Sequence, residues 1–192
     1  MDKDINSEFK SVFRDGNKPA LEEVLNNKER RVGFIKKLLS LYPDYTIISY
    51  KLNIPGKVKN NEVIYQIFEI GLENISDCVE NEKWESVYSK KLNLKTGPEY
   101  FEVISADVSQ VKEKMTLIEE NMTLGRIFDI DVIYLENNNL HYMERREIGY
   151  PNRKCFICNS DAKLCASRRT HSVSDIHKHM QKLIESDGRI KL

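Results

Sequence analysis

Apolar residues recur every three to four positions in four stretches, and this spacing predicts amphipathic helices. The first helix starts at Pro19, which suits a first helical turn, and runs to about Leu41. The second starts at residues 60–61, the third follows a capping Asp107, and the last follows Ser172. Segments with the composition of β-strands lie between these helices.

Runs rich in β-branched and aromatic residues predict strands between the helices. They cover 46–52, 84–94, 100–104, a run through 127–133 and a return strand at 140–145. The order predicts an α+β fold with a mixed or antiparallel sheet flanked by helices. We expect a single domain over 1–192, with 1–16 as a loosely ordered N-terminal extension. Gly71 lies inside the second predicted helix, where it costs roughly 1 kcal/mol against alanine, so we expect a close helix–strand contact there.

Charge and composition narrow the functional classes. The 192 residues carry 30 basic and 30 acidic side chains, so no general affinity for nucleic acid or for an anionic membrane is indicated. No apolar run approaches the roughly 20 residues of a membrane span, and the N-terminus lacks a signal-peptide layout. We therefore expect a cytoplasmic protein whose four cysteines are thiols or metal ligands.

Two aspartates interrupt the most apolar predicted strand. Asp129 and Asp131 are two residues apart, so they point to the same face of the strand. Two adjacent carboxylates repel each other unless a cation lies between them, and Mg²⁺ prefers one or two carboxylates together with phosphate oxygens. One interpretation is a metal-assisted phosphoryl or nucleotidyl transfer site. The other is the solvated face of an edge strand.

Several basic or flexible residues are candidates for phosphate binding. Gly125 and Arg126 lead directly into the aspartate strand and combine a turn with a guanidinium. Lys59 follows a Pro-Gly turn at a helix start, which is either a phosphate site or an ordinary strand-to-helix turn. Glu144, on the predicted return strand, could bring a third carboxylate to the aspartates.

A cluster of soft ligands lies in the Cys/His-rich segment 153–171. Cys155, Cys158, Cys165 and His171 match a Cys₃His zinc set, and the C-x-x-C spacing lets two thiolates bind one ion. The alternative is a cysteine-containing turn before the last helix. Arg168 also lies in this basic segment, just before that helix, where it is a candidate to bind a phosphate.

Taken together, these motifs resemble one enzyme family, the apo-citrate lyase phosphoribosyl-dephospho-CoA transferases, which are holo-acyl-carrier-protein synthases. The similarity covers about 21–185 and is carried by the sequences at 125–132 (GRIFDIDV), 153–158 (RKCFIC), 165–168 (CASR) and His171, with Glu29-Arg30, Pro55-Gly56, Lys59, Phe68 and Gly71 upstream. One departure is Lys57, which stands where a second proline is expected.

The resemblance implies a reaction. Such an enzyme attaches 2′-(5″-triphosphoribosyl)-3′-dephospho-CoA to a serine of the apo acyl carrier protein of citrate lyase, and pyrophosphate leaves. Asp129 and Asp131 would bind Mg²⁺, and either an aspartate or a metal-bound hydroxide would take the serine proton. Gly125 and Arg126 would hold the triphosphate, with Arg30, Lys59 and Arg168 as further phosphate contacts. A fold like that of nucleotidyltransferases is an analogy drawn from the aspartate motif.

Two other hypotheses stay open at this stage. The chain could be a nucleotidyltransferase that acts on another carrier, such as the carrier subunit of malonate decarboxylase. It could also be a non-catalytic zinc-binding interaction module, with the two aspartates simply at the surface.

Overall fold

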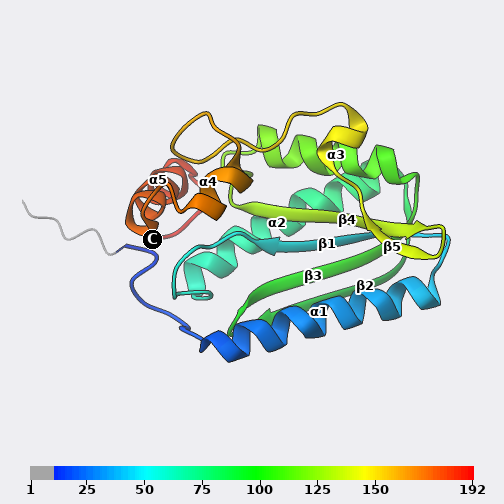
Figure 1. The fold of residues 1–192 in the computed structure, drawn as a ribbon, viewed down its shortest axis with the longest axis horizontal. Helices are drawn as coiled ribbons and strands as arrows, with labels where there is room; N and C mark the ends of the chain where they lie inside the picture. Colours follow the sequence, from blue (N-terminus) through cyan, green and yellow to red (C-terminus); the bar gives the residue numbers. More distant parts are fainter. Residues whose placement is uncertain (1–10) are drawn as a thin grey trace, which may run out of the picture.

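The computed structural model describes residues 11–192, in which helices cover both faces of a five-stranded antiparallel sheet (Figure 1). The strand order is β2-β3-β1-β4-β5. The strands are β1 (Thr46–Leu52), β2 (Glu85–Leu94), β3 (Gly97–Ser105), β4 (Phe128–Glu136) and β5 (Asn139–Tyr142). The helices are α1 (Leu21–Leu41), α2 (Glu62–Asn81), α3 (Val108–Asn121), α4 (Ala162–Arg168) and α5 (Val173–Ser186), with a 3₁₀ turn at Arg145–Ile148. The predicted α+β class with an antiparallel sheet is confirmed.

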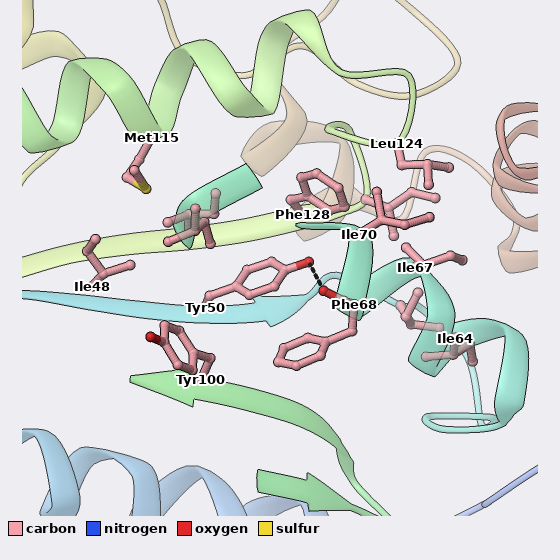
Figure 2. Close-up of a cluster of buried hydrophobic side chains, with 14 of the residues drawn as sticks. Ile48, Tyr50, Ile64, Ile67, Phe68, Ile70, Tyr100, Met115, Leu124 and Phe128 are labelled. Atoms are coloured by element: carbon pink, nitrogen blue, oxygen red, sulfur yellow. Dashed lines mark hydrogen bonds between the residues drawn. The ribbon is translucent and has the colours of Figure 1, made fainter. Parts of the chain in front are cut away.

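The larger core lies between the sheet and helices α2 and α3 (Figure 2). Tyr50 of β1 is fully buried, stacks on Phe68 with ring centroids 4.8 Å apart and meets the edge of Phe128 at 5.7 Å. A methyl group at Gly71 would lie 2.0 Å from the Tyr50 hydroxyl oxygen and 3.0 Å from Phe128. The expected close helix–strand contact at Gly71 is therefore confirmed.

The opposite face of the sheet is covered by α1, but only in part (Figure 1). Ile35, Leu38 and Leu39 pack on the apolar half of this face. The first half of the predicted apolar stripe is not buried, since Leu21 is 74% and Leu25 51% exposed. The reason is that the sheet beneath this half presents charged rather than apolar side chains, as described below.

Two local expectations need correction. The return strand ends at Tyr142 instead of residue 145, because Met143 turns into the core and Arg145 turns to contact α3. The segment before α5 contains a further helix, α4, whose start is capped by the Asp161 carboxylate and which contains Cys165.

Of the expected N-terminal extension, only residues 11–16 are among the described residues. Residues 1–10 lie outside the described residues. Val12 and Phe13 are only 6% and 7% exposed, whereas Ser11 and residues 14–16 are exposed. The Phe13 ring stacks on His177 of α5 at 4.2 Å, and the Val12 amide donates a hydrogen bond to Gln181. Apolar side chains at these positions provide the reason for the order.

Candidate active site

Asp129 and Asp131 lie on the face of β4 that α1 leaves partly open. In the antiparallel register Asp129 pairs with Lys51 of β1, and Lys51 in turn pairs with Glu99 of β3. Directly paired residues share a face, so a charged row crosses three strands. The Lys51 ammonium lies 2.7 Å from Asp129 Oδ2 and 2.9 Å from Asp131 Oδ2. The predicted common face of the two aspartates is therefore confirmed, and the cation between their carboxylates is the ammonium of Lys51.

The charges in this row shift one another's pKa. Burial alone would lower the pKa of Lys51, but the negative charges of Asp131 and Asp129 and their hydrogen bonds raise it. Burial alone would raise the pKa of Asp129, yet the ammonium of Lys51, with smaller effects from Arg153 and Arg31, lowers it. Near neutral pH the pair Lys51–Asp129 is therefore fully charged.

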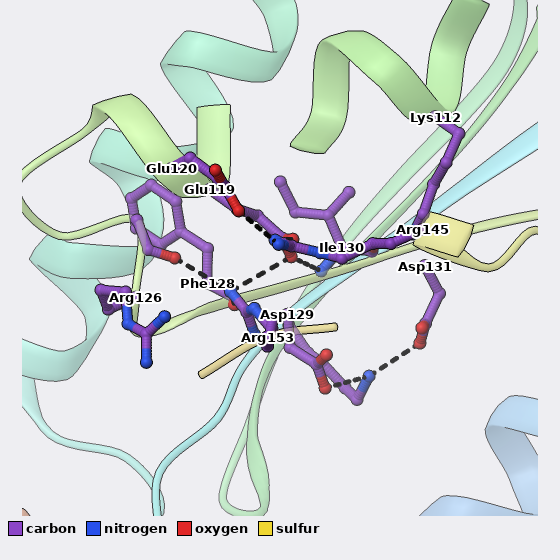
Figure 3. A network of polar contacts seen from close by, with 12 residues as sticks. Lys112, Glu119, Glu120, Arg126, Phe128, Asp129, Ile130, Asp131, Arg145 and Arg153 are labelled. Carbon is purple, nitrogen blue, oxygen red and sulfur yellow. Dashed lines mark hydrogen bonds and ion pairs between the residues drawn. The ribbon is translucent and has the colours of Figure 1, made fainter. Parts of the chain in front are cut away.

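Beside these aspartates, charged side chains form hydrogen bonds with the backbone groups at the free edge of β4 (Figure 3). Glu119 of α3 is 4% exposed and accepts a hydrogen bond from the Ile130 amide at 3.0 Å. Arg145 lies 2.6 Å from Glu119 Oε2, and Arg153 lies 3.4 Å from Oε1. Arg153 also donates to the carbonyl oxygens of Gly125 and Phe128. This network fixes the strand that carries the aspartates.

Helix α1 reaches the same row from the other side. Glu99 is 3% exposed and accepts hydrogen bonds from Asn27 at 2.7 Å and from Arg31 Nη2 at 2.7 Å. Arg31 lines a cavity together with Lys51, Lys59 and Asp129. Three cationic side chains therefore surround one of the two carboxylates.

The predicted phosphate-binding residues occupy different places. Arg126 lies over the Phe156 ring at 5.3 Å and donates to the Lys154 carbonyl oxygen. Gly125 allows a close approach, because a methyl group there would lie 2.5 Å from the Glu119 carbonyl oxygen. Its amide already donates to Met122 at 2.9 Å.

Lys59, Arg30 and Arg168 also differ in their surroundings. Lys59 lines the cavity beside Asp129, donates to the Ile54 carbonyl oxygen, and has its pKa lowered by burial. Arg30 is 53% exposed and lies 3.8 Å from Glu99, beside a separate shallow cavity. Arg168 is exposed at the end of α4. Glu144 lines the same cavity as both aspartates, although it lies outside β5.

The Cys/His cluster forms a compact set of ligand atoms. The side-chain ligand atoms of Cys155, Cys158, Cys165 and His171 all lie within 4.8 Å of one another. Cys158 Sγ is 3.6 Å from Cys165 Sγ and 3.3 Å from His171 Nε2. Tetrahedral zinc with bonds of about 2.3 Å to sulfur places two sulfurs about 3.8 Å apart. The arrangement is consistent with a metal site.

The cysteines of this cluster differ in acidity. Hydrogen bonding, first from the Ser160 backbone and then from His171, lowers the pKa of Cys158 to about 6. Burial raises the pKa of Cys165 to about 11, with further contributions from Cys158 and Cys155. A thiolate at Cys158 is therefore available near neutral pH.

Comparison with known proteins agrees with the resemblance seen in the sequence. Residues 19–187 match the family model of the apo-citrate lyase phosphoribosyl-dephospho-CoA transferases. A probable transferase of this name from Streptococcus pyogenes serotype M3 is 32% identical over 177 residues, covering 92% of this chain and 91% of its own length. Another from Vibrio cholerae serotype O1 is 35% identical over 155 residues, covering 80% and 85%. The chain belongs to this transferase family.

Within the part of this transferase that the structure describes, no helix is long and apolar enough to cross a membrane.

Three basic residues near the site were missed by sequence reasoning. In the sequence, Lys51 looks like one of the polar residues that alternate with apolar ones along a strand. Only the pairing of Lys51 with Asp129 in the sheet shows that it lies at the site. Arg31 lines the cavity that contains Asp129, whereas the sequence had suggested its neighbour Arg30 as the phosphate contact. Arg153 donates a hydrogen bond to the backbone of β4 at Phe128.

Glu119 was also missed, although its position in the sequence indicates a buried charge. It stands four residues after Met115 and three before Met122, within the apolar stripe of α3. A charge on the buried face of a helix needs a partner, and here two arginines from later in the chain supply it.

Proposed function

We propose that this chain transfers the phosphoribosyl-dephospho-CoA group from 2′-(5″-triphosphoribosyl)-3′-dephospho-CoA to a serine of the apo acyl carrier protein of citrate lyase. The family name supports apo-citrate lyase as the acceptor and phosphoribosyl-dephospho-CoA as the transferred group. The observation that carries the proposal is the convergence of Asp129 and Asp131 on one cationic point, with Lys51, Arg31 and Lys59 around it. Such a site suits the reaction of a polyphosphate. We place this reaction in the cytoplasm.

The chemical step is a substitution at phosphorus. The serine oxygen of the carrier attacks the phosphorus nearest the ribose, and the bond from that phosphorus to the bridging oxygen of the next phosphate breaks. A phosphodiester forms and pyrophosphate leaves with the bond's electron pair. The serine proton passes to a carboxylate of the Asp129–Asp131 pair, because Lys51 keeps Asp129 ionised.

Asp129 and Asp131 also fit a divalent cation. Their oxygens already converge within 2.9 Å of one positive charge, and both side chains are about one-third exposed to solvent. Two partly exposed carboxylates suit Mg²⁺, which would replace the Lys51 ammonium between them. When bound, Mg²⁺ would neutralise negative charge that develops on the phosphate oxygens and on the departing pyrophosphate.

The cations around Asp129 would bind the donor's phosphates. Arg31, Lys51 and Lys59 line one cavity of about 210 Å³ next to Asp129, which suits the leaving pyrophosphate. Glu99 orients Arg31 through two hydrogen bonds to the same carboxylate oxygen. In this proposal Arg31 and Lys51 bind phosphate together with Lys59, which the sequence had already suggested.

The Cys155, Cys158, Cys165 and His171 cluster would hold a structural Zn²⁺. The supporting observation is the mutual spacing of the four ligand atoms, which fits a tetrahedral ion. The ion would fix α4 and the loop before it against the start of β4, where Lys154 meets Arg126.

The test is intact-mass spectrometry of the apo acyl carrier protein of citrate lyase, incubated with this chain, the triphosphoribosyl donor and Mg²⁺. The expected result is a mass gain equal to the donor minus pyrophosphate, lost when EDTA is added. No gain with a folded enzyme and a competent carrier would refute the proposal. A gain that persists in EDTA would refute the role of the divalent cation.

A further inference from the structure

A cavity of about 510 Å³ lies between the start of β4, the loop after β1 and the C-terminal helices α4 and α5. Its volume is within the range of small-molecule sites. It is separate from the cavity that holds both aspartates, but Asn53, Arg153, Ala162 and Ala166 line both. A ligand bound here would extend directly to Asp129 and Asp131.

The charge of this cavity is one-sided. Arg126, Arg153, Lys154 and Arg169 line it together with His171. No aspartate or glutamate is among the described residues that line it, although the whole chain carries equal numbers of acidic and basic residues. Three thiolates around Zn²⁺ would add a single net negative charge against these four cations. The cavity therefore favours an anion with more than one charge.

The neighbouring cavity is lined by charges of both signs. The carboxylates of Glu119, Asp129, Asp131, Glu144 and Asp161 line it together with the basic side chains of Lys112, Arg145, Arg153 and Lys163. Of the two cavities, only the first is therefore lined, among the residues that the structure describes, by basic residues without any carboxylate. The contrast assigns the two cavities to different parts of a substrate.

Apolar side chains also line the first cavity. Phe156, Val173 and Ile176 line it, and the Arg126 guanidinium lies 5.3 Å from the centre of the Phe156 ring. A flat base can pack against such side chains while its phosphates meet the guanidinium groups. The chemistry that matches both features is a nucleoside diphosphate.

We propose that this cavity binds the adenosine diphosphate part of the donor, with the base against Phe156 and the diphosphate on Arg126 and Arg169. The identity of the donor rests on the function proposed above, whereas the preference for a nucleoside diphosphate rests on the cavity alone. The triphosphate would then extend past Arg153 to the two aspartates. Arg169, which caps the C-terminal end of α4, lines this cavity, whereas Arg168, the last residue of α4, does not.

Calorimetric titration with 3′-dephospho-CoA, which lacks the triphosphoribosyl group, tests this assignment without any transfer reaction. Four variants would be compared with the wild type: Arg169→Gln, Phe156→Leu, Asp129→Asn and Lys182→Gln. Lys182 is exposed on α5 and serves as the charge-matched control. Circular dichroism and zinc content would confirm that each variant is folded.

We expect dephospho-CoA to bind the wild type without Mg²⁺, and its Kd to rise about 10-fold in Arg169→Gln, the scale of one charge-assisted hydrogen bond. Phe156→Leu should also weaken binding, and it decides the question if Arg169→Gln does not fold. Asp129→Asn and Lys182→Gln should keep the wild-type Kd. Adenosine diphosphate should displace the ligand at a lower concentration than inorganic tripolyphosphate, which lacks the base.

The assignment would be overturned if dephospho-CoA did not bind the wild type, or if the Kd were unchanged in both cavity variants. Displacement by tripolyphosphate at a lower concentration than by adenosine diphosphate would overturn it too, because the base would then add nothing to binding. Binding with the expected pattern, but without transfer to the carrier, would refute the proposed function and leave this assignment intact.

Discussion

The Lys51 ammonium lies 2.9 Å from Asp131 Oδ2 and at the same time 2.7 Å from Asp129 Oδ2. One lysine of β1 thus holds together the two carboxylates of β4. The repulsion between the carboxylates is offset on the sheet itself, before any metal or substrate binds. Lys51 also faces the cavity that contains Arg31 and Lys59, so it lies between the carboxylates and the proposed phosphate site.

Replacing Lys51 with methionine should therefore lower the transfer rate by about 10²-fold, the scale of one lost preorganised electrostatic contact. Lys91→Met is the matched control, because Lys91 of β2 forms a partly exposed ion pair with Glu69 of α2, away from the site. Single-turnover transfer to the carrier measures both. Equal rates for the two variants would show that Lys51 only supports the sheet.

Glu119 and Glu120 provide a test of the network beneath the site. Arg145 contacts both, but the Glu119 side chain is 4% exposed and the Glu120 side chain 44%. Glu119→Gln should lower the free energy of unfolding by about 3 to 5 kcal/mol, because two arginines lose their buried partner. Glu120→Gln should cost at most about 1 kcal/mol. Urea denaturation of the two variants measures this difference. Similar losses of unfolding free energy in both would contradict the buried role of Glu119.

Two glycines in helices should respond to alanine in opposite directions. Gly71→Ala brings a methyl group within 2.0 Å of the buried Tyr50 hydroxyl and should destabilise the protein by about 1 to 3 kcal/mol. Gly33 of α1 is exposed with nothing within 4 Å, so Gly33→Ala should stabilise it by about 0.5 to 1 kcal/mol. Thermal unfolding measures both, and a stabilising Gly71→Ala would contradict the packing described here.

Removal of metal should expose a reactive thiolate at Cys158. Because its pKa lies near 6, the thiolate fraction rises with pH through that value and is nearly complete at pH 7.5. An ordinary cysteine, with a pKa of about 8.5, stays mostly protonated there. After chelation, iodoacetamide should label Cys158 first and Cys165 last, with added zinc protecting both. Peptide mapping that finds Cys165 labelled first, or no protection by zinc, would contradict the metal site.

Much of this fold follows from local pattern. The helix after Asp107 and the helix after Ser172 start where their caps predict, since both side chains accept hydrogen bonds from the first turn. The aspartates share a face because the side-chain period of a strand is two. These features depend on residues close together in the sequence.

The parts that sequence reasoning missed depend on residues far apart. Lys51 meets Asp131 across 80 positions of sequence, and only the register of β1 against β4 brings them together. Arg31 reaches Glu99 across 68 positions. Helix α4 was missed because it is only seven residues long and carries a cysteine that the metal pattern had already explained.

The most direct test of the proposed transfer centre is the single-turnover rate of Asp129→Asn and of Asp131→Asn, followed by intact mass of the carrier. Glu136→Gln is the control, because Glu136 ends the same strand and is 54% exposed. We predict that each aspartate variant loses at least about 10²-fold in rate while the control stays within about twofold of the wild type. Near-normal transfer by either folded aspartate variant would contradict the assignment of this pair as the catalytic centre.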